Sequence, residues 1–264
     1  ILGAQRAGFR AAIKIHHIYD NGEPDEGAEP DAQIENMLDL IPLIKQYLDQ
    51  DAQTAQNDNG HRVKAIFFDA GDILYTRPHK DQHLRAFLDS HQLEFPKGFD
   101  DERKQLKALA FTGKLPRHGY YDQLLRFFGI TDPDLIAEGV EAMQTDDNNV
   151  EIICGAPETI LELKEKGYML GIITDTAMAF SIKLNWFDQH GFGRVWDSVI
   201  SSKEVGARKP DPEMYQRALT QVGVDPCDAV FVGHKKAEID GARDIGMKTI
   251  ALNYDAGTLA DAYI

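Results

Sequence analysis

The sequence contains little cysteine and no long apolar segment. Of its 264 residues only two are cysteine, Cys154 and Cys227, and they lie far apart without the spacing of a metal site or a disulfide framework. This usage favours a reducing, cytoplasmic setting, with Cys154 as a buried structural thiol and Cys227 as a turn residue. No apolar run reaches the ~20 residues that cross a bilayer, and no signal peptide is recognisable.

Positive charge is also scarce. The chain carries 28 Lys and Arg against 43 Asp and Glu, which gives a formal net charge of -15. A chain this acidic repels phosphate backbones and anionic lipid, so we expect no nucleic acid and no membrane among its partners. Hydrophobic residues make up 43% and charged residues 27%, which is ordinary globular composition and excludes a disordered or fibrous chain. Nothing in the composition indicates an oligomeric state.

The first 50 residues resemble the end of a domain. Residues 1–10 match residues 239–248, and in both copies a helix rich in small residues runs to a glycine that precedes a strand. A helix–glycine–strand unit is common in α/β proteins, and that is one interpretation of the match. The interpretation that we favour is a tandem protein, in which residues 1–50 are the remnant of a preceding domain of the same kind.

Both ends of the chain then look cut. Apolar periodicity predicts a helix over residues 34–48. The polar residues 51–61 are typical of a linker. Residues 259–264 indicate the start of a further helix that the chain does not complete.

Two short apolar runs are each followed by a residue whose side chain is suited to catalysis or binding. Asp69 follows residues 63–68, and Thr174 follows residues 169–173. In open parallel sheets, ligands bind beyond the carboxyl ends of the strands. At such a place Asp69 is a nucleophile, a metal ligand or only a turn residue. Thr174 either binds a phosphate oxygen or caps a helix.

Two further segments add charge. Lys209 precedes Pro210 in a turn before a helix, where its ammonium either faces an anionic site or lies on the surface. Residues 229–232 form another apolar run, and this run leads into His234 and Glu238.

The alternation of strands and helices from residue 62 onward predicts an α/β fold with a doubly wound, mainly parallel sheet. Between the first two strands the sequence predicts an all-helical insertion, because apolar residues recur there at helical spacing. We therefore expect a core of residues 62–78 and 150–264 and a helical cap of residues 79–149. The four cap helices are expected at residues 81–91, 100–111, 119–128 and 133–143.

Taken in order, Asp69, Thr174, Lys209 and the segment with Glu238 resemble the haloacid dehalogenase-like hydrolase superfamily, over about residues 62–264. The resemblance implies a Rossmann-like core with the first type of cap. It also implies that Asp69 attacks phosphorus, or carbon in the dehalogenases, to form a covalent aspartyl intermediate. Thr174 and Lys209 would hold and neutralise the transferring group, and the substrate would be a small organic phosphate.

The resemblance further implies Mg²⁺ as cofactor. Its ligands would be Asp69, a backbone carbonyl near Gly71, Glu238 and water, with His234 in the first acidic position of the family's metal motif.

Three residues near these motifs are candidates for substrate binding. They are Gly71, Asp175 and Arg77.

Two positions depart from the family pattern. Family phosphatases carry a second Asp as acid/base two residues after the nucleophile, where this chain has Gly71, and Asp72 one residue further on points another way. Family metal motifs carry two Asp where this chain has His234 and Glu238, and imidazole is a poor ligand for Mg²⁺. One alternative is another divalent metal, because imidazole suits Zn²⁺, Fe or Ni better. A lysine that replaces the charge of the metal is a further alternative.

Two hypotheses follow. One is a phosphatase that acts on a small organic phosphate through Asp69. The other is a degenerate domain that binds a phosphorylated ligand or a partner without turnover, which Gly71 and His234 favour. A dehalogenase is a minor alternative, because the aromatic residue that dehalogenases carry at the position of Gly71 is missing.

Overall fold

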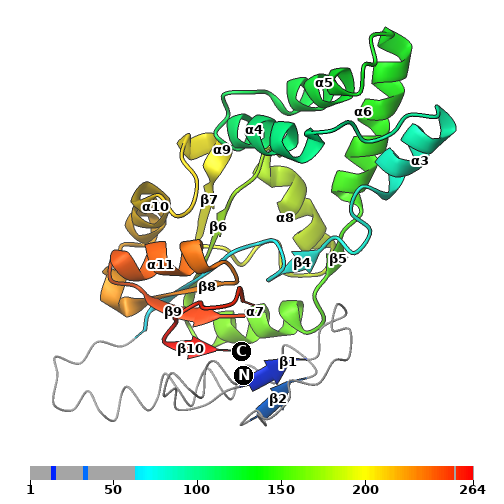
Figure 1. Cartoon of the computed structure of the whole chain (residues 1–264). Coiled ribbons are helices and arrows are strands. Elements are labelled where there is room, and N and C mark those ends of the chain that lie inside the picture. The colour runs from blue at the N-terminus through cyan, green and yellow to red at the C-terminus, as the bar shows by residue number, and fades with distance from the viewer. Residues whose placement is uncertain (1–12, 16–31, 35–62, 253, 264) are drawn as a thin grey trace, which may run out of the picture.

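A six-stranded parallel sheet forms the centre of the molecule (Figure 1). The computed structural model describes residues 13–15, 32–34, 63–252 and 254–263. The strand order is β10-β9-β8-β3-β6-β7, and every neighbouring pair is parallel, which confirms the predicted α/β fold. The strands are β3 (Ala65–Phe68), β6 (Met169–Thr174), β7 (Ser198–Ser201), β8 (Ala229–Gly233), β9 (Lys248–Ala251) and β10 (Ala262–Tyr263).

Strand β3 lies in the middle because its side chains are apolar on both faces. Ile66 and Phe68 pack into the core on one face of the sheet, and Ala65 and Phe67 pack into the core on the other. A strand that is covered on both faces has no place for polar residues, which explains its continuous apolar sequence. The order of the strands along the chain reverses at β3, which makes its carboxyl end the expected ligand-binding point.

Helices cover both faces of the sheet, as expected for a doubly wound fold (Figure 1). Apolar residues of α7 (Ala156–Glu165) and α8 (Phe180–Gln189) join the core on one face. Those of α10 (Pro212–Val222) and α11 (Lys236–Asp244) join the core on the other face. The short elements α9 (Ser202–Val205) and η3 (Pro226–Asp228) lie in the connections.

Four helices form the cap and share a separate core of their own. They confirm the four predicted cap helices and are α3 (Gln82–Ser90), α4 (Phe99–Phe111), α5 (Arg117–Phe127) and α6 (Pro133–Asn148). Helix α6 runs beyond its predicted end, and the cause is a long-range contact. The buried carboxylate of Asp146 accepts hydrogen bonds from the backbone N–H groups of His83 and Leu84, each at 2.9 Å, at the start of α3.

The chain enters and leaves the cap through two short strands. β4 (Tyr75–Thr76) and β5 (Glu151–Ile152) form an antiparallel pair, in which Tyr75 lies opposite Ile152. Both connections between the cap and the core therefore run side by side.

Two expectations were wrong. The helix expected from residue 259 onward does not form in the described residues 259–263, because β10 pairs with β9 and the Asp261 carboxylate accepts a hydrogen bond from the N–H of Thr249 at 2.7 Å. Cys154 is exposed rather than buried, because it lies in the turn before α7, where Gly155 has a φ of 78°.

Most of the first 62 residues lie outside the described residues. These include most of the proposed remnant domain, all of its linker and nearly all of the helix at 34–48. The structure describes β1 (Ile13–Ile15) and β2 (Ala32–Ile34), which pair in parallel, so Ile34 is in a strand. Among the described helices, none combines the length and the apolar character that a membrane span requires.

Candidate active site

Three neighbouring strands bring the candidate residues together at the carboxyl edge of the sheet. Phe68 lies opposite Ile172 of β6 and Val232 of β8. The residues that follow these three positions therefore lie side by side at the carboxyl edge of the sheet. Asp69 directly follows β3, and its backbone N–H donates to the carbonyl of Val232 at 2.9 Å. Thr174 ends β6 on one side of Asp69, and His234 follows β8 on the other.

Lys209 links Asp69 to Glu238, and these three residues are called the centre below. Its Nζ lies 2.6 Å from Oδ1 of Asp69 and 2.6 Å from Oε2 of Glu238. All three side chains are almost fully buried, with the Lys209 side chain 1% exposed. Residues that are far apart in the sequence thus form one buried group of two carboxylates and one ammonium.

The charge state of Asp69 follows from this arrangement. Burial raises the pKa of the Asp69 carboxyl, but the positive charges of Lys209, Lys235 and His234 outweigh it, and the pKa lies below its ordinary value. Burial lowers the pKa of Lys209, and the charges of Asp69 and Glu238 reverse this, so its pKa lies above the ordinary value. Asp69 is therefore a carboxylate at neutral pH, as a nucleophile must be.

The loop that carries Lys209 is held from two sides. A Cβ at Gly241 of α11 would come within 2.6 Å of Pro210, so only glycine permits this approach of helix and loop. On the other side, Oδ1 of Asp175 accepts a hydrogen bond from the backbone N–H of Lys209 at 3.1 Å, and Oδ2 accepts one from Nε of Arg208 at 3.2 Å. Burial and the charge of Glu238 raise the pKa of Asp175. Asp175 thus positions the Lys209 loop.

His234 occupies the other side of Asp69. Its Nδ1 lies 3.5 Å from Oδ2 of Asp69, and its Nε2 lies 4.0 Å from Oδ2 of Asp72. Asp72 has a φ of 58° and a side chain that is 44% exposed, so it lies at the rim of the centre. Gly71 leaves space, because a Cβ there would meet only Oη of Tyr75, at 4.0 Å.

The sequence reasoning missed a residue beside Thr174. Nζ of Lys183 on α8 donates a hydrogen bond to Oγ1 of Thr174 at 2.9 Å, and the Lys183 ammonium lies 5.5 Å from the centre of the Tyr75 ring. The side chain is buried among apolar neighbours of the same helix, Phe180 and Phe187. A lysine within the apolar stripe of a helix was the signal in the sequence that could have revealed it.

Arg77 lies outside this group of charges. Its Nε donates to the carbonyl of Asp147 at 3.2 Å, and its guanidinium lies over the rings of Tyr75 and Trp186. The structure thus places Arg77 at the junction of cap and core.

The cap presents positive charge to the core. Lys107 and Arg208 lie over the same ring, that of Phe111, at 5.2 and 5.1 Å from its centre. Partial burial and the charges of Arg103 and Lys235 lower the pKa of Lys107 to about 8. Because Arg208 directly precedes Lys209 in the chain, its contact with the Phe111 ring places this part of the cap near the candidate site.

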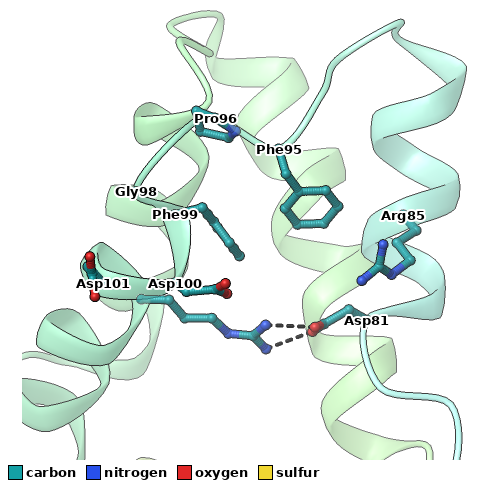
Figure 2. Close-up of a pocket in the computed structure, with 9 residues that line it drawn as sticks. Asp81, Arg85, Phe95, Pro96, Gly98, Phe99, Asp100 and Asp101 are labelled. Carbon is teal, nitrogen blue, oxygen red and sulfur yellow. Dashed lines mark hydrogen bonds and ion pairs between the residues drawn. The ribbon is translucent and has the colours of Figure 1, made fainter.

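One pocket belongs to the cap alone. Its volume is about 650 Å³, and its wall includes Asp81, Arg85, Phe95 and Arg103 (Figure 2). The Arg103 guanidinium donates two hydrogen bonds to the Asp81 carboxylate, at 2.6 and 2.7 Å. None of the candidate catalytic residues lines this pocket, so we place the active site at the sheet edge instead.

The fold and this group of charges define an α/β core with a helical cap and a buried, ion-paired aspartate at the end of its central strand. A family model described as haloacid dehalogenase-like hydrolase matches residues 118–252. The chain belongs to this family.

Curated relatives agree with the assignment. A glyceraldehyde 3-phosphate phosphatase of Pyrococcus furiosus is 31% identical over 206 residues, which cover 73% of this chain and 82% of that protein. The pyrophosphatase PpaX of Bacillus velezensis is 36% identical over 92 residues, which cover 35% of this chain and 42% of that protein.

Solved structures share the fold. A 2-haloacid dehalogenase of Pseudomonas syringae aligns with a TM-score of 0.58 and 23% identity over 76% of this chain and 94% of that chain. The HAD-hydrolase YfnB of Bacillus subtilis, crystallised with magnesium, aligns with a TM-score of 0.58 and 17% identity over 77% of this chain and 94% of that chain.

Proposed function

We propose that this chain is a phosphatase that hydrolyses small organic phosphates through a phosphorylated Asp69. The observation that carries the proposal is the buried Asp69 carboxylate at the end of β3, which Lys209 keeps ionised at a distance of 2.6 Å. The names of the relatives, several of them glyceraldehyde 3-phosphate phosphatases, support phosphorus rather than carbon as the atom attacked.

The reaction requires two displacements at phosphorus. In the first, an Asp69 oxygen forms a bond to phosphorus, the bond to the ester oxygen breaks, and the alcohol leaves with a proton from the solvent. In the second, water attacks the phosphoaspartate, inorganic phosphate leaves, and the carboxylate is restored. Lys209 is placed to neutralise charge on the transferring group in both steps, and Thr174 offers its hydroxyl at the neighbouring strand end.

The cap supports a small substrate. The loop after α4 contacts α9 so closely that a Cβ at Gly113 would lie 2.7 Å from the carbonyl oxygen of Lys203. A helical layer attached this tightly beside the carboxyl edge of the sheet leaves little room for a folded phosphoprotein. The cationic groups Lys107 and Arg208 favour an anionic substrate.

The expected Mg²⁺ ligands are a poor fit to that ion. Both oxygens of Glu238 contact lysine ammonium groups, and His234 replaces a carboxylate with an imidazole. Within the described part of the chain, no three His, Cys, Asp or Glu side chains form a group that could hold a metal. The proposed reaction therefore contains no step through a metal.

A second candidate function is binding without turnover. Gly71 favours it, because the position that carries the acid/base in family phosphatases has no side chain here. Loss of a general acid/base lowers the rate by roughly 10²–10⁴-fold, which slows a phosphatase without abolishing its reaction with a good leaving group.

The test is release of inorganic phosphate by the whole chain from an aryl phosphate and from glyceraldehyde 3-phosphate. We expect turnover by the unmodified chain and none by Asp69→Asn, because an amide oxygen is a far weaker nucleophile than a carboxylate. Asp188→Asn at the exposed end of α8 is the matched control and should retain full activity. A folded Asp69→Asn protein that hydrolyses as fast as the control would refute the nucleophile, and an unmodified chain that binds phosphate without turnover would support the second candidate.

A further inference from the structure

The group around Asp69 contains more positive charge than the family pattern predicts. Lys209 lies 2.6 Å from Asp69 and 2.6 Å from Glu238. Nζ of Lys235 lies 3.1 Å from the other oxygen of Glu238, Oε1. Each oxygen of Glu238 thus already has a cationic partner, and the two carboxylates are matched by two ammonium groups.

Glu238 keeps the negative charge of the family's Asp, but the other departures from the family pattern near Asp69 make this group less negative. His234 replaces a carboxylate, Lys235 follows it directly, and Gly71 replaces a second carboxylate. Besides the Lys209 ammonium, which the family pattern shares, a divalent cation next to Asp69 would face the ammonium of Lys235, and it would find the imidazole of His234 instead of a carboxylate oxygen. The first effect repels the cation, and the second removes a ligand that Mg²⁺ prefers.

The position of Lys235 allows its ammonium to take the place of the positive charge of a metal ion. It is the N-cap residue of α11, with its backbone at the carboxyl edge of the sheet. Its side chain is 53% exposed, so the ammonium can approach a bound anion from the solvent side while Glu238 restrains it. Lys236, the next residue, pairs instead with Asp240 on the outer surface of the helix.

We propose that Lys235, together with Lys209, supplies at Asp69 the positive charge that a divalent cation would otherwise supply, so that this centre binds and transfers phosphate without a metal. The part that concerns transfer rests on the proposed phosphatase function. The part that concerns binding does not, because it can be measured in a chain that shows no turnover.

The first experiment measures binding of inorganic phosphate to the whole chain by calorimetry, with a chelator and with excess Mg²⁺. We expect the same dissociation constant in both conditions. Tightening by Mg²⁺ of roughly tenfold or more would overturn the proposal, since it would show that the metal assists binding of the anion. In a chain without any hydrolytic activity the same comparison remains decisive, so failure of the proposed function is distinguishable from failure of this inference.

The second experiment attempts to create a metal site. The double variant His234→Asp with Lys235→Ser restores a carboxylate and removes the competing ammonium. We expect it to bind Mn²⁺ at one saturable site, detected by electron paramagnetic resonance, whereas the unmodified chain binds none. Mn²⁺ binding at Asp69 by the unmodified chain, abolished by Asp69→Asn, would overturn the proposal.

Single variants separate the role of Lys235 from a general charge effect. Lys235→Ser should weaken phosphate binding and lower kcat/KM by roughly tenfold, which is less than for a fully buried donor because solvent screens its ammonium. Lys236→Ser removes the same charge one residue further on and should change neither quantity. Equal effects of the two variants would contradict a specific role for Lys235.

Discussion

Installing a carboxylate at Gly71 should convert this chain into a faster phosphatase, and the structure permits the change. Gly71 lies two residues after the nucleophile, and its φ is outside the left-handed region. A Cβ there would meet only the Tyr75 hydroxyl, at 4.0 Å, which is ordinary contact. Replacing glycine at such a position typically stabilises a fold by about 0.4–1 kcal/mol through the unfolded chain, so Gly71→Asp should fold.

The magnitude of the gain depends on the leaving group. A positioned general acid contributes roughly 10²–10⁴-fold where the departing oxygen needs a proton. An alkyl phosphate has such a leaving group, whereas a nitrophenyl phosphate leaves as a stable anion and needs little help. We therefore expect kcat for an alkyl phosphate to rise by roughly 10²-fold in Gly71→Asp and kcat for the aryl phosphate to rise by less than roughly tenfold.

The assay compares the two substrates in three proteins. The unmodified chain provides the baseline, and Gly71→Asn is the matched control because its side chain has the same shape as Asp but no acidic proton. If Gly71→Asn accelerates the alkyl phosphate as much as Gly71→Asp does, or if the aryl and alkyl phosphates gain equally, the missing acid/base is not what limits this centre.

Three further variants test the surroundings. Lys183→Met should raise the free energy of unfolding by roughly 1 kcal/mol or more, because the described partners of this buried ammonium are only the Thr174 hydroxyl and the Tyr75 ring. It should also lower kcat/KM, because Thr174 loses its hydrogen-bond donor. A lower thermal stability of the variant in calorimetry would contradict the first expectation. Arg103→Met should lower the free energy of unfolding by about 1 kcal/mol. Burial raises the pKa of Asp81, but the effect of Arg103 is larger, and the pKa in the folded chain lies below its ordinary value. The pair therefore stabilises the fold above the unfolded pKa of about 4, and this contribution disappears as the pH falls through the lowered folded pKa. If chemical denaturation shows that Arg103→Met loses the same stability above and below this pH range, the pairing is contradicted. Lys107→Met should raise KM by roughly threefold at neutral pH and not above the pKa of about 8, where the ammonium is already lost, and an effect of the same size at both values would exclude a charge role.

The sequence predicted those site residues whose positions follow directly from the strand that precedes them in the chain. Asp69 and Thr174 follow apolar runs, and such runs become neighbouring parallel strands whose ends coincide, so their meeting required only the fold class. The cap helices followed from apolar spacing for the same reason. Even so, the roles assigned to Gly71 and Asp175 in substrate binding remain predictions.

Contacts between distant segments account for what the sequence did not reveal. The hydrogen bond from Lys183 to Thr174 joins a helix to a strand, and the added turns of α6 serve Asp146, which binds the start of α3. The sequence of residues 259–264 resembles the start of a helix, yet Ala262 and Tyr263 pair with β9 as a parallel strand. In each case the energy comes from a partner that periodicity does not identify.

The pairing of β4 with β5 makes the cap a removable module. Tyr75 and Ile152 lie opposite each other, so the chain ends left by excising the cap would lie within about 5.5 Å, a gap that a two-residue hairpin turn can close. The charged centre draws none of its members from the excised segment, since Asp69, Lys209 and Glu238 all belong to the core. Access to the nucleophile and the chemistry of the nucleophile can therefore evolve, or be engineered, independently. A shortened chain would present the same reactive carboxylate to substrates as large as a phosphorylated peptide.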